Sequence, residues 1–141
     1  MGEHPIRLLS KEQSEQLRKL AERARLSLSR FSGVDVEYDV IGLQMLDEWI
    51  ERHVRQFPQP GKEMITLWGA FLGEVFVRRL NGAWVVAHIK GGQRLGVLCP
   101  REGRGMVFVD VMAQVRQRVK EGMEASLAFF YTTKAIDIKS G

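Results

Sequence analysis

The sequence contains few of the residues that form disulfides and metal centres. Among its 141 residues there is one cysteine, Cys99, so an intramolecular disulfide and a CxxC metal site are both excluded. The three histidines, His4, His53 and His88, lie far apart, and the HExxH and calcium-loop motifs are absent. We therefore expect no bound metal ion.

Long apolar runs are also missing. The longest, residues 64–77, is interrupted by Glu74 and falls short of the roughly 20 residues that cross a membrane. The N-terminal stretch has no apolar segment as long as that of a secretory signal, and no small-residue cleavage site follows it. We expect a cytoplasmic protein that does not contact a membrane.

The remaining composition is that of an ordinary globular domain, with 45% apolar and 27% charged residues. This length predicts a single domain over 1–141, in which 1–9 and 136–141 are flexible tails. The net charge of +4 is divided unevenly, since residues 1–60 sum to −1 and residues 61–141 to +5. Such an asymmetry can face an acidic partner, although a solvated surface is the simpler explanation.

Periodicity and capping signals predict three helices in the first half of the chain. Ser10 and Gln13 form a capping box that opens a helix to about residue 30, and Gly33 suits its left-handed C-cap. A second, amphipathic helix is expected at 38–56. Its apolar stripe begins at Ile41, and Asp47 falls on the opposite, polar side.

The third helix is expected at 62–80 and is apolar on nearly every side, which is typical of a helix in the middle of a domain. Gly69 and Gly73 share one face of it, where they would let another backbone approach closely. Glu74 is the exception to its apolar character. Arg78 lies four residues further on, so a helical ion pair explains Glu74 more simply than catalysis does.

Asn81-Gly82 is a strong turn signal, and it introduces strands at 83–89 and 94–99 around a loop at 90–93. A short strand is expected at 106–109, and a helix capped by Asp110 at 111–121. The segment 123–135 is ambiguous, and we favour a helix. The sequence thus predicts an α+β fold: three N-terminal helices, an antiparallel hairpin or three-stranded meander, and one or two C-terminal helices.

Both faces of the predicted hairpin are apolar. A loop centred on Gly91-Gly92 places Ile89 opposite Arg94 and Trp84 opposite Cys99. Since an antiparallel hairpin normally keeps one wet face, we expect both faces to be covered, by helices, a second copy or a partner protein. The candidate contact residues share one face, although burial in the core explains them equally well. They are Trp84, Val86, His88 and Leu95.

No catalytic arrangement emerges from these elements. Cys99 and His88 share a face of the hairpin but stand about 13 Å apart at the rise of a strand, too far for a catalytic dyad. The glycine-rich segments 91–92 and 103–105 lack the spacing of a phosphate-binding loop. We expect neither a nucleotide cofactor nor any other.

Basic residues of the second half form a candidate patch. Arg116 and Lys120 share a helix face, but cations near a helix C-terminus offset its dipole and need no ligand. No known nucleic-acid-binding motif accompanies them. The members of the candidate patch are Arg94, Arg101, Arg104, Arg116 and Lys120.

Three short motifs lie between residues 64 and 122. They are Leu72-Gly73-Glu74 in an apolar helix, Asn81-Gly82-Ala83-Trp84-Val85 at the start of a hairpin, and Val115-Arg116 with Val119-Lys120 in the closing helix. This stretch resembles a group of small bacterial domains of unknown function, from which it departs at the end of the second strand and around Asp110. The resemblance implies a three-stranded meander beside helices, structural roles for Gly73, Glu74 and Trp84, and no known activity.

A two-sided apolar hairpin without catalytic groups favours a non-enzymatic protein–protein interaction module, such as an adaptor, a specific chaperone or an immunity-like protein. Its expected partner is another protein or a second copy of the chain. The alternative is a weak nucleic-acid-binding protein that uses the basic C-terminal half. A further alternative is an enzyme with Glu74 as acid or base.

Overall fold

A computed structural model describes residues 5–103 and 105–140. It confirms the α+β class: a short first strand is followed by three helices, three strands and two helices, and the four strands form one sheet. In chain order the elements are β1 (Ile6–Leu8), α1 (Lys11–Ser32), α2 (Val40–Gln56), α3 (Lys62–Arg79), β2 (Ala83–Ile89), β3 (Gly92–Pro100), β4 (Met106–Val109), α4 (Val111–Glu121), the 3₁₀ turn η1 (Gly122–Ala125) and α5 (Leu127–Lys139).

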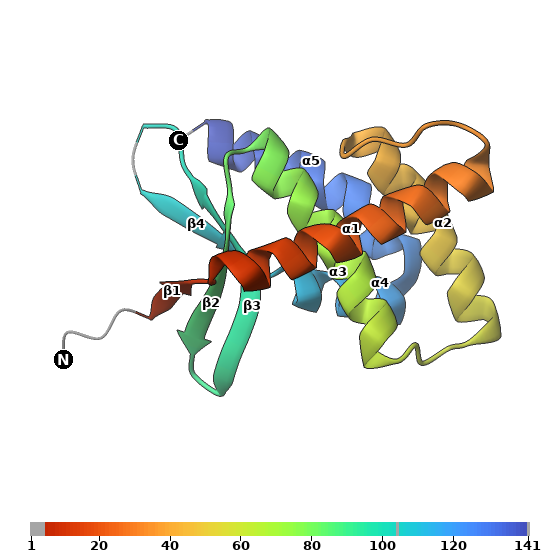
Figure 1. The fold of residues 1–141 in the computed structure, drawn as a ribbon, viewed down its shortest axis with the longest axis horizontal. Helices are drawn as coiled ribbons and strands as arrows, with labels where there is room; N and C mark the ends of the chain where they lie inside the picture. The colour runs from red at the N-terminus through yellow and green to blue at the C-terminus, as the bar shows by residue number, and fades with distance from the viewer. Residues whose placement is uncertain (1–4, 104, 141) are drawn as a thin grey trace.

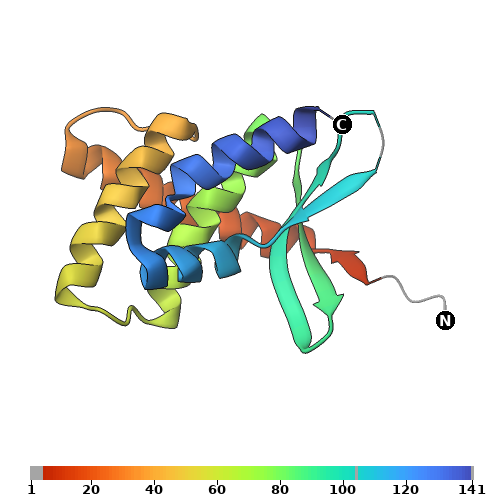
Figure 2. The same cartoon turned by 180° about the vertical axis from the view of Figure 1, so that it is seen from behind.

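The helices gather at one end of the molecule and the sheet at the other, with the β2–β3 hairpin projecting from the helices (Figures 1 and 2). Helix α3 runs through the middle, and its residues 68–76 are all buried. Within the described ranges, none of the helices combines the length and apolar character that crossing a bilayer requires.

The capping signals of the sequence are all used. The side chains of Ser10 and Gln13 each accept a hydrogen bond from the other's backbone amide, and Gly33 ends α1 with a left-handed φ of 78°. Asp110 accepts from the amide of Ala113 and opens α4. Because these signals act over three or four residues, they are set by local sequence alone.

The sheet has an N-terminal strand that the sequence analysis did not predict. Residues 6–8 pair antiparallel with β2, with Ile6 opposite Ala87 and Leu8 opposite Val85. At the other end of the chain, α5 extends to Lys139. Regular structure therefore reaches into both segments where we expected tails.

The register of the hairpin differs from the predicted one by two residues. Trp84 lies opposite Val97 rather than Cys99, and Ile89 lies opposite Gly92 rather than Arg94. The cause is the turn, which is two residues shorter than expected because β3 already begins at Gly92. Side chains alternate with a period of two, so an even shift leaves every residue on its predicted face.

The two faces of the sheet have different surroundings. On the inner face, Trp84, Val97 and Cys99 belong to the main hydrophobic core. On the outer face, Val85 and Ala87 are buried but lie outside that core. Other apolar residues of the outer face stay largely exposed, namely Leu8, Ile89 and Met106. The inner face is thus covered at its base, around Trp84 and Val97, and open at the hairpin tip, whereas the outer face is covered only in part.

The glycines of α3 allow close packing, as expected, but the groups that pack on them are side chains and not a neighbouring backbone. A β-carbon on Gly73 would lie 2.0 Å from Cη2 of Trp84, and one on Gly69 would lie 2.2 Å from the sulfur of Met112. Each glycine therefore provides the space for one large side chain of the neighbouring sheet or helix.

Candidate functional site

A buried carboxylate joins α2 to the start of α5. Both oxygens of Asp47 accept hydrogen bonds from the first turn of α5: Oδ1 from the amide of Leu127 at 2.9 Å, and Oδ2 from the amide of Ala128 at 3.1 Å and the hydroxyl of Ser126 at 2.9 Å. The otherwise unsatisfied amides of that helix end are thus bound from a different helix. Asp47 thereby fixes where α5 begins relative to α2.

Arg118 of α4 balances this buried charge. Its Nε donates to Oδ1 of Asp47 at 2.9 Å, and its Nη2 donates to the Asp47 carbonyl at 2.9 Å and to Glu51 at 3.0 Å. Asp47 and Arg118 are each only 1% exposed. The pair corrects the expectation that Asp47 lies on the polar side of its helix, and it locks α2, α4 and α5 together.

A groove runs along the outside of this junction, between the first half of α2 and the first turns of α5. It holds a cavity of about 710 Å³ whose lining includes Met45 of α2. Three of its apolar side chains are largely exposed: Ile41 (58%), Met123 (53%) and Phe129 (70%). We call this feature the α2–α5 groove. Two smaller depressions adjoin it, one sharing Met45 and the other sharing Phe129.

The charges along the α2–α5 groove are of one sign. Glu48 lines the groove itself, and Glu121 and Glu124 line the depression on the other side of Phe129. Of the residues described, no lysine or arginine lines either of these two cavities. The one cation nearby is Arg52, which lines the smaller depression beside Met45 and Glu48 within the described ranges. This contrasts with the chain as a whole, which carries a net charge of +4.

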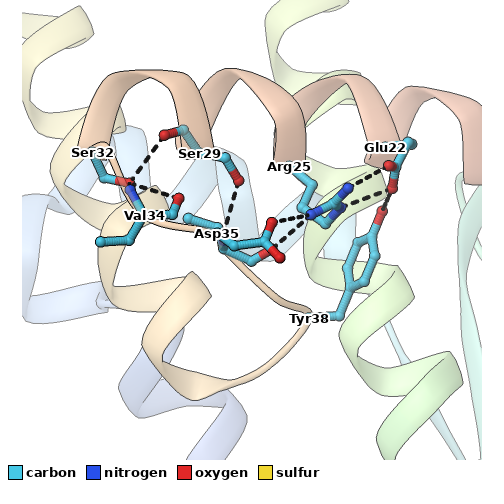
Figure 3. A network of polar contacts seen from close by, with 8 residues as sticks. Glu22, Arg25, Ser29, Ser32, Val34, Asp35 and Tyr38 are labelled. Atoms are coloured by element: carbon cyan, nitrogen blue, oxygen red, sulfur yellow. Dashed lines mark hydrogen bonds and ion pairs between the residues drawn. The ribbon is translucent and has the colours of Figure 1, made fainter.

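The loop that leads into α2 is held to α1 by a polar network (Figure 3). Arg25 donates to the carbonyl of Val36 at 2.9 Å and pairs with Glu22 and Asp35, while the hydroxyl of Tyr38 donates to Glu22 at 2.9 Å. The hydrogen bond from Arg25 is the main cause that lowers the pKa of Glu22 to about 2. These charged groups are bonded to one another, so the network holds the loop before α2 against α1.

Glu74 and Arg78, which were expected to be structural, form one cluster with Trp84 and Tyr38, whereas Gly69 packs against Met112. Glu74 is 3% exposed, and its two oxygens accept from the indole Nε1 of Trp84 and from Nε of Arg78, each at 2.9 Å. The guanidinium of Arg78 also stacks on the ring of Tyr38, 4.2 Å from its centre. With both oxygens bonded, Glu74 has the contacts of an anchor for Trp84.

The candidate contact residues of the hairpin all lie on the inner face, and their burial decreases toward the hairpin tip. Trp84 is buried in the core, Val86 and Leu95 are half-buried, and His88 near the hairpin tip is exposed. The structure places them on one strand pair, with Val86 directly opposite Leu95. They do not gather around a cavity.

Cys99 is fully buried, and burial raises the pKa of its thiol to about 12. A thiol with that pKa is not a nucleophile at neutral pH. Nor do three or more His, Cys, Asp or Glu side chains converge anywhere in the described ranges in a way that could hold a metal ion.

The predicted basic patch is divided by the fold. Arg94 pairs with Asp110 and Arg101 with Asp137, at opposite ends of β3. Arg116 and Lys120 are exposed on α4, and Arg104 lies outside the described residues. Arg94 and Arg116 do line one cavity together.

No family model, curated protein or solved structure matches the chain. The resemblance to small bacterial domains therefore stays a prediction. The α2–α5 groove was missed because Ile41 fits the apolar stripe of its helix and Phe129 lies in the ambiguous segment 123–135. The exposure of both depends on where α5 docks, which no local pattern encodes.

Proposed function

We propose that the chain is a non-enzymatic protein-binding module, of the kind found in adaptors, specific chaperones or immunity-like proteins. The partner contributes an amphipathic helix with lysine or arginine along its polar edges, which lies in the α2–α5 groove. The observation that carries the proposal is a groove with large exposed apolar side chains beside an acidic rim, which consists of Glu48 in the groove and Glu121 and Glu124 in the adjoining depression.

The apolar part supplies the affinity. Ile41, Met123 and Phe129 expose more than half of their surface and stand on three separate segments around one cavity. Burying a large apolar side chain contributes about 1.5–3 kcal/mol. A groove between two helices fits the apolar face of a third, a common mode of peptide recognition.

The charged part selects the partner. Glu48, Glu121 and Glu124 attract a helix with basic edges and repel an acidic one. A second copy of the chain docked through the same groove would place two acidic rims against each other. Charge complementarity therefore favours a basic partner over a symmetric dimer at this surface.

The state of the polar groups elsewhere supports a role without catalysis. Glu74 is occupied by Trp84 and Arg78, the Cys99 thiol is buried, and the charges around Tyr38 are paired. A general acid or base needs a pKa near the working pH and access to a substrate. Neither Glu74 nor Cys99 offers that access.

The test is a titration with two designed helical peptides of about 18 residues, or five turns. Both carry leucines on one face, and their polar edges carry lysine in one peptide and glutamate in the other. We expect the lysine peptide to bind, by fluorescence anisotropy, at least about tenfold more tightly than the glutamate peptide. Phe129→Ser should weaken binding of the lysine peptide by about tenfold or more.

Ile136→Ser is the matched control. Ile136 is exposed on the same helix as Phe129 but does not line the groove, so its replacement should leave binding unchanged. Equal affinity for the two peptides, or equal losses in both variants, would contradict the proposal. Self-association that Phe129→Ser abolishes, without binding of either peptide, would assign the groove to a second copy instead.

A further inference from the structure

A second cavity, of about 510 Å³, lies where the start of α3, the first half of β3 and α4 meet. It is separate from the α2–α5 groove and shares no lining residue with it. Its volume falls within the range of about 300–1,000 Å³ that is typical of small-molecule sites. We infer that this cavity binds a small phosphate monoester whose organic part is apolar or aromatic, such as a mononucleotide.

Three cationic side chains from three different elements line this cavity: Lys62 of α3, Arg94 of β3 and Arg116 of α4. Among the described residues, Asp110 is the one acidic side chain that lines it. Lys62 and Arg116 form no ion pair with any residue of the described ranges. The formal charge around the cavity is therefore +2, and an anion would relieve the mutual repulsion of its cations.

Asp110 holds Arg94 in place, and its single negative charge offsets only one of the three positive charges around the cavity. One of its oxygens caps α4 through the amide of Ala113, and the other accepts from Nη1 of Arg94 at 3.0 Å. A guanidinium has five N–H donors, so the remaining donors of Arg94 stay available to a ligand. A cation held in this way loses little conformational freedom when the ligand binds.

The rest of the lining is largely apolar. Ile65 and Met112 are buried in the hydrophobic core beneath the cavity, and Leu95 is half-buried beside them. Polar side chains are contributed by Thr66 and Gln93. A ligand that fills this space thus needs an apolar body as well as an anionic group.

Charge decides between the two common anionic groups. A phosphate monoester carries about −1.5 to −2 at neutral pH and presents three acceptor oxygens, whereas a carboxylate carries one charge and two oxygens. Three cationic groups with a net charge of +2 around the cavity match the monoester. A nucleic-acid backbone offers phosphodiesters of single charge, and it needs an extended basic track instead of one cavity.

The test is calorimetric titration of the whole chain with adenosine monophosphate, adenosine, inorganic phosphate and a short oligothymidine. We expect adenosine monophosphate to bind at least about tenfold more tightly than adenosine or inorganic phosphate, because binding needs both the cationic side chains and the apolar lining of the cavity. Arg116→Met and Lys62→Met should each weaken it by about tenfold, since each removes a charge-assisted hydrogen bond.

Lys120→Met is the matched control: Lys120 is exposed one turn beyond Arg116 on α4 and does not line the cavity. It should leave the affinity unchanged. The inference is overturned if adenosine monophosphate does not bind, if Lys120→Met costs as much as Arg116→Met, or if oligothymidine binds more tightly than the mononucleotide. Peptide binding at the α2–α5 groove is measured independently, so failure of one assignment does not decide the other.

Discussion

At Asp47 a single carboxylate receives hydrogen bonds from two different helices. It accepts from the first amides of α5 and from Arg118 of α4, while its own backbone belongs to α2. Burying two opposite charges is costly unless they are well hydrogen-bonded, and here both oxygens of Asp47 and the Nε and Nη2 of Arg118 have partners. The geometry of the α2–α5 groove depends on this residue, because Asp47 and Phe129 are linked through the first turn of α5.

Asp47→Asn should destabilise the fold by about 3 kcal/mol, the lower end for a broken buried pair, because Arg118 then keeps only the partly exposed Glu51 as a counter-ion. Urea unfolding followed by circular dichroism measures this loss. The double variant Asp47→Asn with Arg118→Met removes both charges and should recover a large part of it. A loss below about 1 kcal/mol for Asp47→Asn would show that the pair does not hold the helices together.

The buried thiol of Cys99 should make the stability of the fold depend on pH in alkaline solution. Burial raises the pKa of the folded thiol from 9.0 to about 12, so above pH 9 the unfolded chain loses the proton while the folded chain keeps it. The thiol's contribution to the free energy of unfolding is therefore fully present below pH 9. Above pH 9 this contribution should fall by about 1.4 kcal/mol per pH unit.

Comparing the unfolding of the native chain and of Cys99→Ala between pH 8 and pH 10 isolates this contribution, since the tyrosines and lysines are common to both. The difference in unfolding free energy should shrink as the pH rises. A constant difference would mean that the thiol is not shielded in the folded state.

At the scale of elements, the sequence predicted features that depend on neighbouring residues and missed features that depend on residues far apart in the chain. The caps at Ser10, Gly33 and Asp110 act within a turn and were predicted correctly. The hairpin faces were also correct, but the register was not, because Gly91 and Gly92 allow turns of more than one length. Strand β1 was missed because three residues carry no periodicity and their pairing is set by β2 alone.

The packing of α3 against the sheet yields a sharper prediction. In Gly73→Ala the new β-carbon would meet the indole of Trp84, which must move and lose its hydrogen bond to Glu74. We expect a loss of about 1–3 kcal/mol in unfolding free energy and a shift in tryptophan fluorescence.

Gly61→Ala at the start of the same helix is the control. No atom lies within 4 Å of its added β-carbon, so the change should cost less than about 1 kcal/mol, the size of a capping effect. Similar losses in the two variants would indicate that Gly73 is not required for the seating of Trp84.

At the scale of the whole molecule, two of the cavities in the described part of the chain carry opposite charge. The α2–α5 groove is acidic and apolar, and the cavity at the start of α3 is basic with an apolar floor. Neither could be derived from composition, because the net charge of +4 averages over both. Arg94 and Arg116 were predicted as basic candidates, but their meeting with Lys62 depends on how three elements pack.

Neutralising the acidic rim tests the electrostatic part of this account. The variant Glu48→Gln with Glu124→Gln should weaken the lysine peptide by about tenfold at low salt and make its affinity less dependent on salt. Glu12→Gln with Glu15→Gln in α1 is a matched pair of acidic residues that line neither depression. If both double variants behave alike, the rim does not select the partner.

The most direct test of the central claim is to map the lysine peptide onto the chain by ¹⁵N–¹H chemical-shift perturbation. We expect the perturbed amides to cluster along α2 and the first turns of α5, around Ile41, Gln44, Phe129 and Thr132. The amides on the outer face of the sheet, around Leu8 and Ile89, should stay unchanged. Perturbations confined to that sheet face, or found nowhere, would contradict the assignment of the α2–α5 groove as the protein-binding surface.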